Sequence, residues 1–414
     1  MANVERAKYG AAAFADLTGK LPGPFPRTIG PNTAGYLQEV LESGLSCDMI
    51  GRFERAFAAE LGVKHCIAAP GCTPSLAMLA SALEFAHGDE IIVSPITDYG
   101  TLQGLIRENY IPVFADTAPG SVNMSAETIA PCISDRTRAI ICVHKTGMMN
   151  DMDPIMELAA KHNLVVIEDC CQAVFSTYKG RLAGTIGHAA AFSFDSEKTM
   201  GSDTGGCIVT NDDDLTERMR FYGQSRGAKM QPHFGRLHVM PGYAFRMPLC
   251  TAAVTLGQLE IIHENVAQRD KMIRLQTELM AEIPGIIPLP IPDYQEVYSC
   301  WMVCINLAPG AFTCGAEEFG DQLAAEGLPG AGIGNYYLMP EALTFLNENA
   351  QAGKYPYSKP PASRDYRYDE TTCPTAHNTL QSLVRWSTFC EKYEPEHCRL
   401  AAEIVRVVAD RNRS

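Results

Sequence analysis

Apolar runs and helix-like segments alternate along roughly the first half of the chain. The helical spacing of apolar residues predicts two helices within 33–62 and another over 74–86. Short runs rich in aliphatic and β-branched residues predict strands at 65–70, 90–95, 111–116, 138–144, 164–169, 191–194 and 206–210. This alternation is typical of an α/β fold, in which a mostly parallel sheet is covered by helices on both faces.

The pattern changes in the second half of the chain. We expect a long helical segment over roughly 248–282 to lead into a smaller α+β region. That region is predicted to hold strands near 298–306, a helix near 316–326 and a final helix near 394–411. The polar segment 353–370, rich in Pro and Tyr, is expected to be a long loop. The glycines of 330–334 predict a turn, because they form no full GxGxxG motif and follow no clear strand.

These elements suggest three parts: an N-terminal arm over 1–28, a large domain over 29–265 and a small C-terminal domain over 266–414. A chain of 414 residues is long enough for two or three domains with a large core. We see no internal repeat and no low-complexity segment that would change this division.

Composition narrows the class of protein. With 46% hydrophobic and 20% charged residues, the chain is an ordinary globular protein. A formal net charge of −14 argues against nucleic acid or an anionic membrane as the main partner. No run approaches the ~20 apolar residues of a membrane span, and the N-terminus lacks an apolar signal core. The 15 cysteines form no CxxC pair and no clustered ligand set. We therefore expect reduced thiols in a cytoplasmic protein, and no metal site.

An acid and a lysine stand at the ends of two predicted strands, where ligands bind in open α/β sheets. Asp169 ends the strand 164–169, and Lys198 follows the apolar run 191–194. A pyridoxal phosphate (PLP) enzyme needs this pair: the lysine amine forms a Schiff base with the cofactor aldehyde, and the acid keeps the pyridinium nitrogen protonated. Taken alone, an aspartate such as Asp169 is more commonly a cap for the next helix.

Two neighbouring features qualify this pair. Glu168 is expected to point to the opposite face of the sheet, since side chains alternate along a strand. Lys145 is a rival lysine that follows another predicted strand, but we expect it to lie in a connecting loop.

Hydroxyl and amide groups near the same strand ends could complete a binding site. The turn 70–75 precedes a predicted helix, whose first N–H groups can bind an anion, and Thr73 adds a hydroxyl. Pro74 makes the same turn an ordinary helix start as well. Ser193 could bind phosphate or bond only to the backbone, and Gln172 could contact the ligand of Asp169 or be a plain helix residue.

The order of these motifs resembles the PLP-dependent sugar aminotransferases of the DegT/DnrJ/StrS family, within the fold type I (aspartate aminotransferase-like) group. The likeness runs from about residue 29 to the end. It rests on the stretches SGLSCDMIGRFERAFAAELGVKHCIAAPGCTPSLAMLASAL, GDEIIVSPITDYGTLQGLI, VVIEDCCQA, SFDSEKTMGSDTGGCIVTNDDDL and GYAFRMPLCTAAVTLGQLE. The resemblance implies a fold type I PLP-transferase and a homodimer with both active sites at the interface.

The resemblance also assigns roles. Lys198 would be the Schiff-base lysine and Asp169 the partner of the pyridine nitrogen, with Gln172 on the side of the cofactor's 3-hydroxyl. Phosphate would be bound by the backbone and hydroxyl groups of Cys72, Thr73 and Ser193. Position alone suggests two substrate-binding candidates, Arg246 and Tyr336.

The chain departs from the family pattern at several positions. Asp98 stands where an aromatic residue usually stacks on the pyridine ring, so either the adjacent Tyr99 stacks there or the ring is covered differently. Ala244 replaces an asparagine that contacts phosphate from the other subunit. Asp203 and Thr204 replace the Gly-Glu of a GEGG motif. The 353–370 segment loosely resembles an extension of the cyclitol (scyllo-inosose) aminotransferase branch.

The resemblance implies a ping-pong aminotransferase. It would move an amino group from glutamate or glutamine to a keto or aldehyde group of a sugar or cyclitol. Two alternatives remain. One is a PLP-dependent sugar dehydratase, although such enzymes carry histidine in place of the lysine. The other is a non-catalytic regulatory protein with an inherited PLP pocket.

Overall fold

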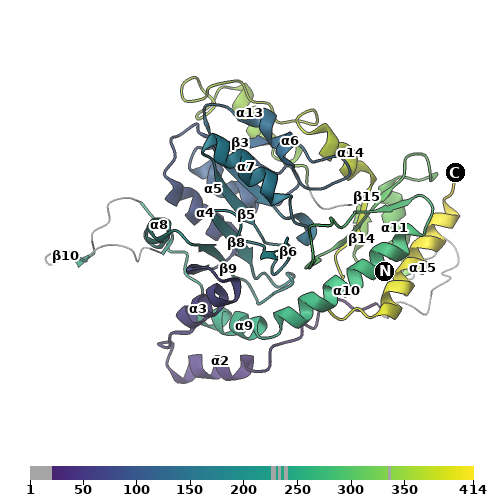
Figure 1. Ribbon diagram of the computed structural model, residues 1–414, viewed down its shortest axis with the longest axis horizontal. Helices are drawn as coiled ribbons and strands as arrows, with labels where there is room; N and C mark the ends of the chain where they lie inside the picture. Colours follow the sequence, from purple (N-terminus) through teal and green to yellow (C-terminus); the bar gives the residue numbers. More distant parts are fainter. Residues whose placement is uncertain (1–20, 225–229, 232–234, 237–240, 334–336) are drawn as a thin grey trace.

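The computed structural model describes residues 21–224, 230–231, 235–236, 241–333 and 337–414 (Figure 1). Within these ranges a seven-stranded sheet has the order β1-β9-β8-β5-β4-β2-β3. Its strands are β1 (His65–Ala69), β2 (Glu90–Val93), β3 (Ile111–Phe114), β4 (Thr137–Val143), β5 (Val165–Asp169), β8 (Ala189–Ser193) and β9 (Gly206–Thr210). Strands β3, β2, β4, β5 and β8 are parallel, whereas β9 is antiparallel to both β8 and β1. The predicted α/β fold with a mostly parallel sheet is confirmed.

Helices bury both faces of this sheet (Figure 1). Alternate residues of β2 illustrate this: Ile91 and Val93 join one apolar cluster, and Ile92 joins the other. The first face is covered by α4 (Cys72–Leu83), α5 (Gly100–Arg107) and α8 (Asp213–Gln224). The second is covered by α3 (Met49–Leu61), α7 (Met152–His162) and α9 (Leu249–Leu259). Burial on both faces explains why these strands are continuous apolar runs in the sequence.

A second, antiparallel sheet has the order β12-β13-β15-β14. Its strands are β12 (Ile286–Pro288), β13 (Val303–Leu307), β14 (Ala331–Ile333) and β15 (Leu383–Trp386). The helices α10 (Ile262–Ala281), α11 (Ala316–Glu326) and α15 (Pro395–Arg411) pack with it. The remaining elements are α2 (Thr33–Glu42), α6 (Ala126–Ile129), η2 (Ala130–Cys132), η3 (Lys145–Gly147), β6 (Thr177–Tyr178), β7 (Arg181–Leu182), β10 (Met230–Gln231), β11 (Gly235–Arg236), α12 (Met339–Ala342), α13 (Thr344–Gln351) and α14 (Pro374–Ser382).

Two predicted elements need correction. The helical segment expected over 248–282 is two helices, since α9 ends at Leu259 and α10 begins at Ile262. The turn expected over 330–334 is wrong for its described part, because Ala331–Ile333 forms the edge strand β14. Glycine serves close packing there: a Cβ on Gly320 of α11 would lie 2.6 Å from the Cα of Gly332.

The segment 353–370 has no helix or strand, as predicted, yet it is firmly attached to the large sheet. The buried carboxylate of Glu90 in β2 accepts hydrogen bonds from Arg364 Nε (2.9 Å) and Nη2 (2.7 Å), and from the Tyr366 hydroxyl (2.6 Å). The Tyr368 hydroxyl donates to the carbonyl of Pro112 in β3. The chain thus returns from the second sheet to the first.

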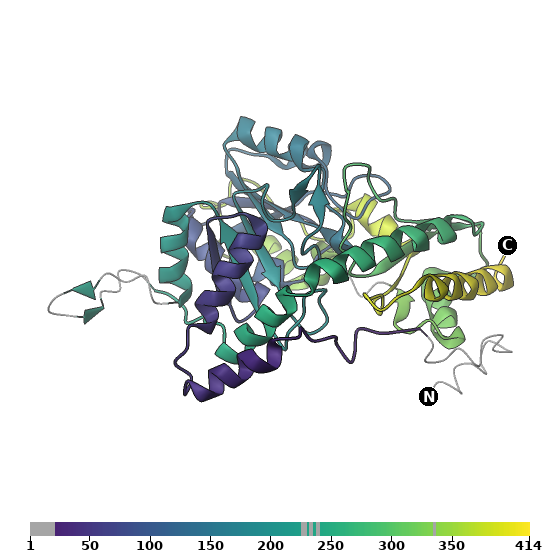
Figure 2. The same cartoon turned by 60° about the horizontal axis from the view of Figure 1, so that its bottom comes forward.

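The described part of the N-terminal segment runs from the side of α15 to α2 (Figure 2). The Lys392 ammonium donates to the Gly23 carbonyl at 3.3 Å, which fixes this segment against the C-terminal part of the chain. The division into 1–28, 29–265 and 266–414 stays a prediction. Among the residues that the structure describes, none of the helices has both the length and the apolar character needed to cross a membrane.

Candidate active site

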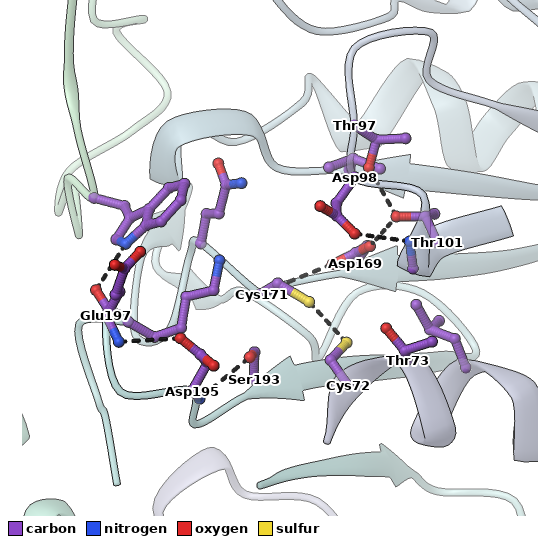
Figure 3. A pocket seen from close by; sticks show the side chains of 16 residues that line it. Cys72, Thr73, Thr97, Asp98, Thr101, Asp169, Cys171, Ser193, Asp195 and Glu197 are labelled. Carbon is purple, nitrogen blue, oxygen red and sulfur yellow. Dashed lines mark hydrogen bonds between the residues drawn. The ribbon is translucent and has the colours of Figure 1, made fainter. Parts of the chain in front are cut away.

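A cavity of about 330 Å³ lies at the carboxyl ends of β4, β5 and β8 (Figure 3). Six of the residues predicted to bind the cofactor line it: Cys72, Thr73, Asp169, Gln172, Ser193 and Lys198. They come from segments up to 126 positions apart in the sequence, which the parallel sheet brings together. The volume falls within the ~300–1,000 Å³ that is usual for small-molecule sites.

The Asp169 carboxylate is held in place from two sides at the end of β5. Its Oδ2 accepts a hydrogen bond from the Thr101 hydroxyl at 2.8 Å, and its Oδ1 accepts one from the Cys171 N–H at 3.1 Å. Thr101 is in turn hydrogen-bonded to Thr97 at 2.7 Å. The carboxylate is buried and fixed in orientation, as required of an acid that pairs with one particular cationic atom.

The neighbouring Glu168 lies on the opposite face of the sheet, as strand alternation predicts. It is hydrogen-bonded to His144 Nε2 at 3.0 Å and accepts bonds from the N–H groups of Gly184, Ile186 and Gly187. Burial alone would raise the pKa of Glu168, but the His144 contact and these N–H donors hold it below its ordinary value. Glu168 therefore has a structural partner set separate from the cavity.

Lys198 lies on a short loop after β8 that is held by groups from distant segments. Its Nζ atom is 3.8 Å from the centroid of the Trp301 ring. The Trp301 Nε1–H donates to the Glu197 carbonyl at 2.9 Å. From the N-terminal segment, Arg27 Nη2 donates to the carbonyls of Ser196 (2.7 Å) and Lys198 (2.6 Å). Neither Trp301 nor Arg27 was found by sequence reasoning, because no local pattern marks a contact across such separations.

The N-terminus of α4 forms another wall of the cavity. Its first N–H groups have no carbonyl partner within the helix and can bind an anion. Two glycines allow other segments to pack closely against the first residues of α4. A Cβ on Gly206 would lie 2.5 Å from the Cys72 nitrogen, and one on Gly100 would lie 2.3 Å from the Thr73 hydroxyl oxygen. Glycine at 206 is thus required by the approach of β9 to the start of this helix.

Gln172 and Ser193 complete the predicted set. The Gln172 side-chain oxygen accepts a hydrogen bond from the Thr146 N–H at 2.7 Å, which turns its amide toward η3. The Ser193 hydroxyl accepts a weaker bond from the Asp195 N–H at 3.4 Å. Both residues line the cavity.

Three predicted site residues are not brought to the cavity. Tyr99 is half-buried outside it and packs edge-on against Phe345, with ring centroids 6.3 Å apart. Arg246 is exposed and lines a different cavity, near Asp48. Tyr336 lies outside the described residues.

Asp98, the residue before Tyr99, does reach the cavity. Its side chain lines the cavity and accepts a hydrogen bond from the Gly100 N–H at 2.8 Å (Figure 3). Asp98, and not Tyr99, therefore supplies a side chain to this part of the cavity wall.

Lys145 was expected in a connecting loop, and it lies in the connection between β4 and α7. It lies in η3 and is only 2% exposed. Burial, and then the positive charge of Lys198, lower the pKa of Lys145 well below its ordinary value. It is not among the residues that line the cavity, so Lys198 is the lysine that reaches it.

The sequence showed no clustered ligand set, but in the folded chain two groups of potential metal ligands do lie close together. The potential ligand atoms of Cys72, Asp169 and Cys171 lie within 4.8 Å of one another, and so do those of His144, Glu168 and Cys170. The first group includes residues almost a hundred positions apart, so spacing in the sequence gave no sign of it.

The cavity residues fit pyridoxal phosphate. A fixed carboxylate can pair with a pyridinium N–H, a helix N-terminus with hydroxyls can bind a phosphate, and a lysine amine faces the same space. The start of α4 lies at the cavity wall beside the Thr73 hydroxyl, and these donors are the observation that favours a phosphate.

The sequence was compared with protein families and curated proteins. A sequence model of the DegT/DnrJ/EryC1/StrS aminotransferase family matches residues 27–381. The GDP-perosamine synthase of Caulobacter vibrioides is 35% identical over 292 residues, which are 70% of this chain and 77% of that protein. A Micromonospora echinospora protein provisionally named L-glutamine:3-amino-2,3-dideoxy-scyllo-inosose aminotransferase is 34% identical over 274 residues, 65% of each chain.

The fold was compared with solved structures. The crystal structure of 3-amino-5-hydroxybenzoic acid (AHBA) synthase superposes with a TM-score of 0.80 at 24% identity, covering 94% of this chain and 100% of that one. At this identity the likeness concerns the fold.

Proposed function

The chain belongs to the DegT/DnrJ/EryC1/StrS aminotransferase family, and from this premise we propose the roles of its cavity residues in amino transfer. The family, the fold type I architecture, the enzyme class and the cofactor predicted from the sequence agree with these matches. The protein is a PLP-dependent aminotransferase. The convergence of six predicted residues on one cavity carries the proposal.

When bound, pyridoxal phosphate would supply an aldehyde whose oxygen is replaced by the donor's amino nitrogen, and a ring that accepts electrons from the donor's α-carbon. Asp169 would accept a hydrogen bond from the ring N–H, in the orientation that Thr101 and the Cys171 N–H fix. Thr73 and the first amides of α4 would bind the phosphate. Ser193 and Gln172 would hold the phosphate and the 3-hydroxyl side of the ring, respectively.

Lys198 is the proposed general base. Its Nζ would take a proton from the α-carbon of the amino donor and hold it within the cavity for the rest of the half-reaction. The Trp301 ring facing Nζ and the Arg27 bonds to the loop carbonyls hold the amine at the cavity wall. Positioning of this kind supplies much of the rate of a proton transfer. We assign no ring-stacking role to Tyr99, because Asp98 takes that side of the cavity.

The amino donor is proposed to be glutamate or glutamine, and the acceptor a keto group on a sugar or cyclitol. The names of the Caulobacter and Micromonospora relatives support this choice of substrate class. We further propose a homodimer with both active sites at the interface. Arg246 and Tyr336 would then serve the site of the partner subunit, since Arg246 is exposed away from its own cavity. The cytoplasm, where thiols stay reduced, is the proposed compartment.

The visible absorption spectrum before and after addition of glutamate or glutamine tests the function. The protein should bind the cofactor with a visible band, and the amino donor alone should abolish that band, because the half-reaction needs no acceptor. A protein that stays colourless with added pyridoxal phosphate would instead support the regulatory alternative. A coloured protein that releases water from a hexose without consuming a donor would support the dehydratase.

A further inference from the structure

Two cysteine thiols meet inside the active-site cavity. The Sγ atom of Cys171 lies 2.7 Å from the Sγ atom of Cys72, and Figure 3 shows the two sulfurs pointing at each other. A disulfide bond needs about 2.05 Å between the sulfurs. Closure by about 0.65 Å would therefore bond them.

The two thiols project from opposite walls of the cavity, and these walls are proposed to bind opposite ends of the cofactor. Cys72 is the first residue of α4, whose amides form the proposed phosphate site. Cys171 lies two residues after Asp169, donates its N–H to that carboxylate, and precedes Gln172. A bond between the sulfurs would tie the phosphate wall to the loop that holds the ring nitrogen.

We propose that Cys72 and Cys171 form a reversible disulfide that is made by a small-molecule disulfide oxidant and that weakens cofactor binding. The inference rests on the proposed cofactor site. The first cysteine sulfur attacks the oxidant RS–SR and forms a mixed disulfide, Cys–S–SR. The released thiolate takes up the cysteine's proton and leaves as RSH. The second sulfur attacks that bond and the other RSH leaves, so two electrons pass from the cysteines to the oxidant.

Contact between the sulfurs favours the second step. Once one of them carries RS, the other is already positioned for attack, so the ring-closing step is intramolecular. Both side chains line the cavity, which gives a small oxidant a route to them. Bound cofactor would fill this space, so we expect oxidation of the cofactor-free protein and protection of the loaded one.

The charges around the pair set its pH dependence. Contact with Cys171 lowers the pKa of Cys72, but burial and the Asp169 charge outweigh it and raise that pKa above its ordinary value. The contact with Cys72, and then burial, raise the pKa of Cys171 well above its ordinary value.

The other facing groups are Cys207, whose charge would also raise the pKa of Cys72, and Lys198, whose ammonium lowers both. Since the thiolate is the reactive form, oxidation should be faster at pH 8.5 than at pH 7.

The effect on the cofactor follows from the distance between the two walls. Two unbonded thiols keep their sulfurs further apart than a disulfide does, so the oxidised form holds α4 closer to the Asp169 loop. The distance between the pyridine nitrogen and the phosphate of the cofactor is fixed by its rigid ring, so the cofactor cannot adapt to a shorter distance between the two walls. We expect the cofactor dissociation constant of the oxidised protein to be at least about tenfold higher, and to return to its original value after reduction.

The test uses cofactor-free full-length protein treated with oxidised glutathione. Peptide mapping before and after reduction reads the bond, and titration with pyridoxal phosphate reads the cofactor affinity. The matched pair is Cys171→Ala and Cys170→Ala, adjacent positions of which only 171 faces Cys72. Cys170→Ala also removes the ambiguity of two neighbouring cysteines in one peptide. Peptide mapping of oxidised Cys170→Ala should show Cys72 linked to Cys171. Cys171→Ala should give no linked peptide and no loss of cofactor affinity on oxidation.

Each result decides the proposal. A linked peptide with reduced cofactor affinity, reversed by a thiol reductant, supports it. Absence of the 72–171 link, equal oxidant sensitivity of both variants, or a link that leaves cofactor affinity unchanged overturns it. If the reduced protein itself binds no pyridoxal phosphate, the proposed function fails, while the peptide mapping still reads the disulfide.

Discussion

The ammonium nitrogen of Lys198 lies 3.8 Å from the centroid of the Trp301 indole ring. Lys198 lies in the loop that follows β8 of the large sheet, and Trp301 lies just before β13 of the second sheet. The Trp301 Nε1–H also donates to the Glu197 carbonyl next to the lysine. Trp301 thus contacts both the amine and the backbone of the loop. A cation over an aromatic face is attracted by about 0.5–2 kcal/mol, depending on how far it is desolvated.

Replacing Trp301 should slow proton transfer more than it weakens cofactor binding. Trp301→Ala is expected to lower the rate of the glutamate half-reaction about tenfold, since the amine loses its aromatic partner and the loop one hydrogen bond. Trp301→Phe keeps a ring but has no N–H, so its rate should fall between those of the wild type and Trp301→Ala. Stopped-flow absorbance with saturating cofactor measures the rate. Equal rates for all three proteins would show that the tryptophan has no positioning role.

The two lysines near the cavity should differ sharply in function. Lys198→Ala is expected to bind pyridoxal phosphate but to lose the half-reaction with any amino donor, because the proton acceptor is gone. Lys145→Met is expected to keep turnover, since Lys145 is buried outside the cavity lining. Donor-dependent absorbance change reads both variants. Full turnover by Lys198→Ala would remove the lysine from the mechanism.

Gly206 should tolerate no side chain. Its added Cβ would lie 2.5 Å from the Cys72 nitrogen, and a backbone atom at that position cannot rotate away. Gly206→Ala is expected to cost about 1–3 kcal/mol of stability and at least about tenfold in cofactor affinity, because the first turn of α4 is displaced.

The matched control is Gly35→Ala in α2, where an added Cβ would meet nothing within 4 Å. Cofactor titration and the melting temperature of both variants should separate a local clash from a general effect of alanine. Unchanged affinity in Gly206→Ala would argue against a phosphate site at the start of α4.

The residues that carry chemistry could be predicted from the sequence because they stand at strand ends. Asp169 and Lys198 follow apolar runs that are buried on both faces, and such runs are visible without any knowledge of the fold. Trp301 and Arg27 could not be found in this way. Their roles depend on contacts with a loop more than a hundred positions away, and neither is marked by periodicity.

Two features of the secondary structure, the break between α9 and α10 and the strand β14, could not be predicted because their causes do not show in the sequence. The break between α9 and α10 carries no Pro or Gly, and Ile261 simply takes a non-helical conformation with φ −114° and ψ 0°. Glu260, at that break, accepts a hydrogen bond from the Asn32 side chain at 3.2 Å, so a tertiary contact accompanies the interruption. The edge strand β14 was taken for a turn because its glycine reflects packing on α11.

The segment 353–370 should depend on its bond to the large sheet. Glu90 is completely buried, and Arg364 binds both of its oxygens. Arg364→Ala leaves that carboxylate with neutral donors only, so we expect a loss of about 2–4 kcal/mol in the free energy of unfolding. The melting temperature measures it. Adding Glu90→Gln to Arg364→Ala should recover part of the loss, and a wild-type melting temperature in the single variant would contradict the assignment.

The buried Glu168–His144 pair should make stability sensitive to acid. The pKa of Glu168 is held below its ordinary value in the folded protein, while the unfolded chain has the ordinary value. The stabilisation is therefore complete above about pH 5 and is lost as the pH falls through the lowered pKa of the folded state. Glu168→Gln should already be less stable at pH 7, and its melting temperature should decline less steeply between pH 5 and pH 3.

Many carboxyl groups protonate in the same range, so the comparison needs a control of the same chemistry. Glu278→Gln changes an exposed glutamate in α10 and should follow the wild-type curve. The difference between the Glu168→Gln and Glu278→Gln curves then isolates the buried carboxylate. Parallel curves for both variants would mean that Glu168 contributes nothing to the acid sensitivity, and that its bonds to His144 and the Gly184–Gly187 backbone are matched in the unfolded chain by water.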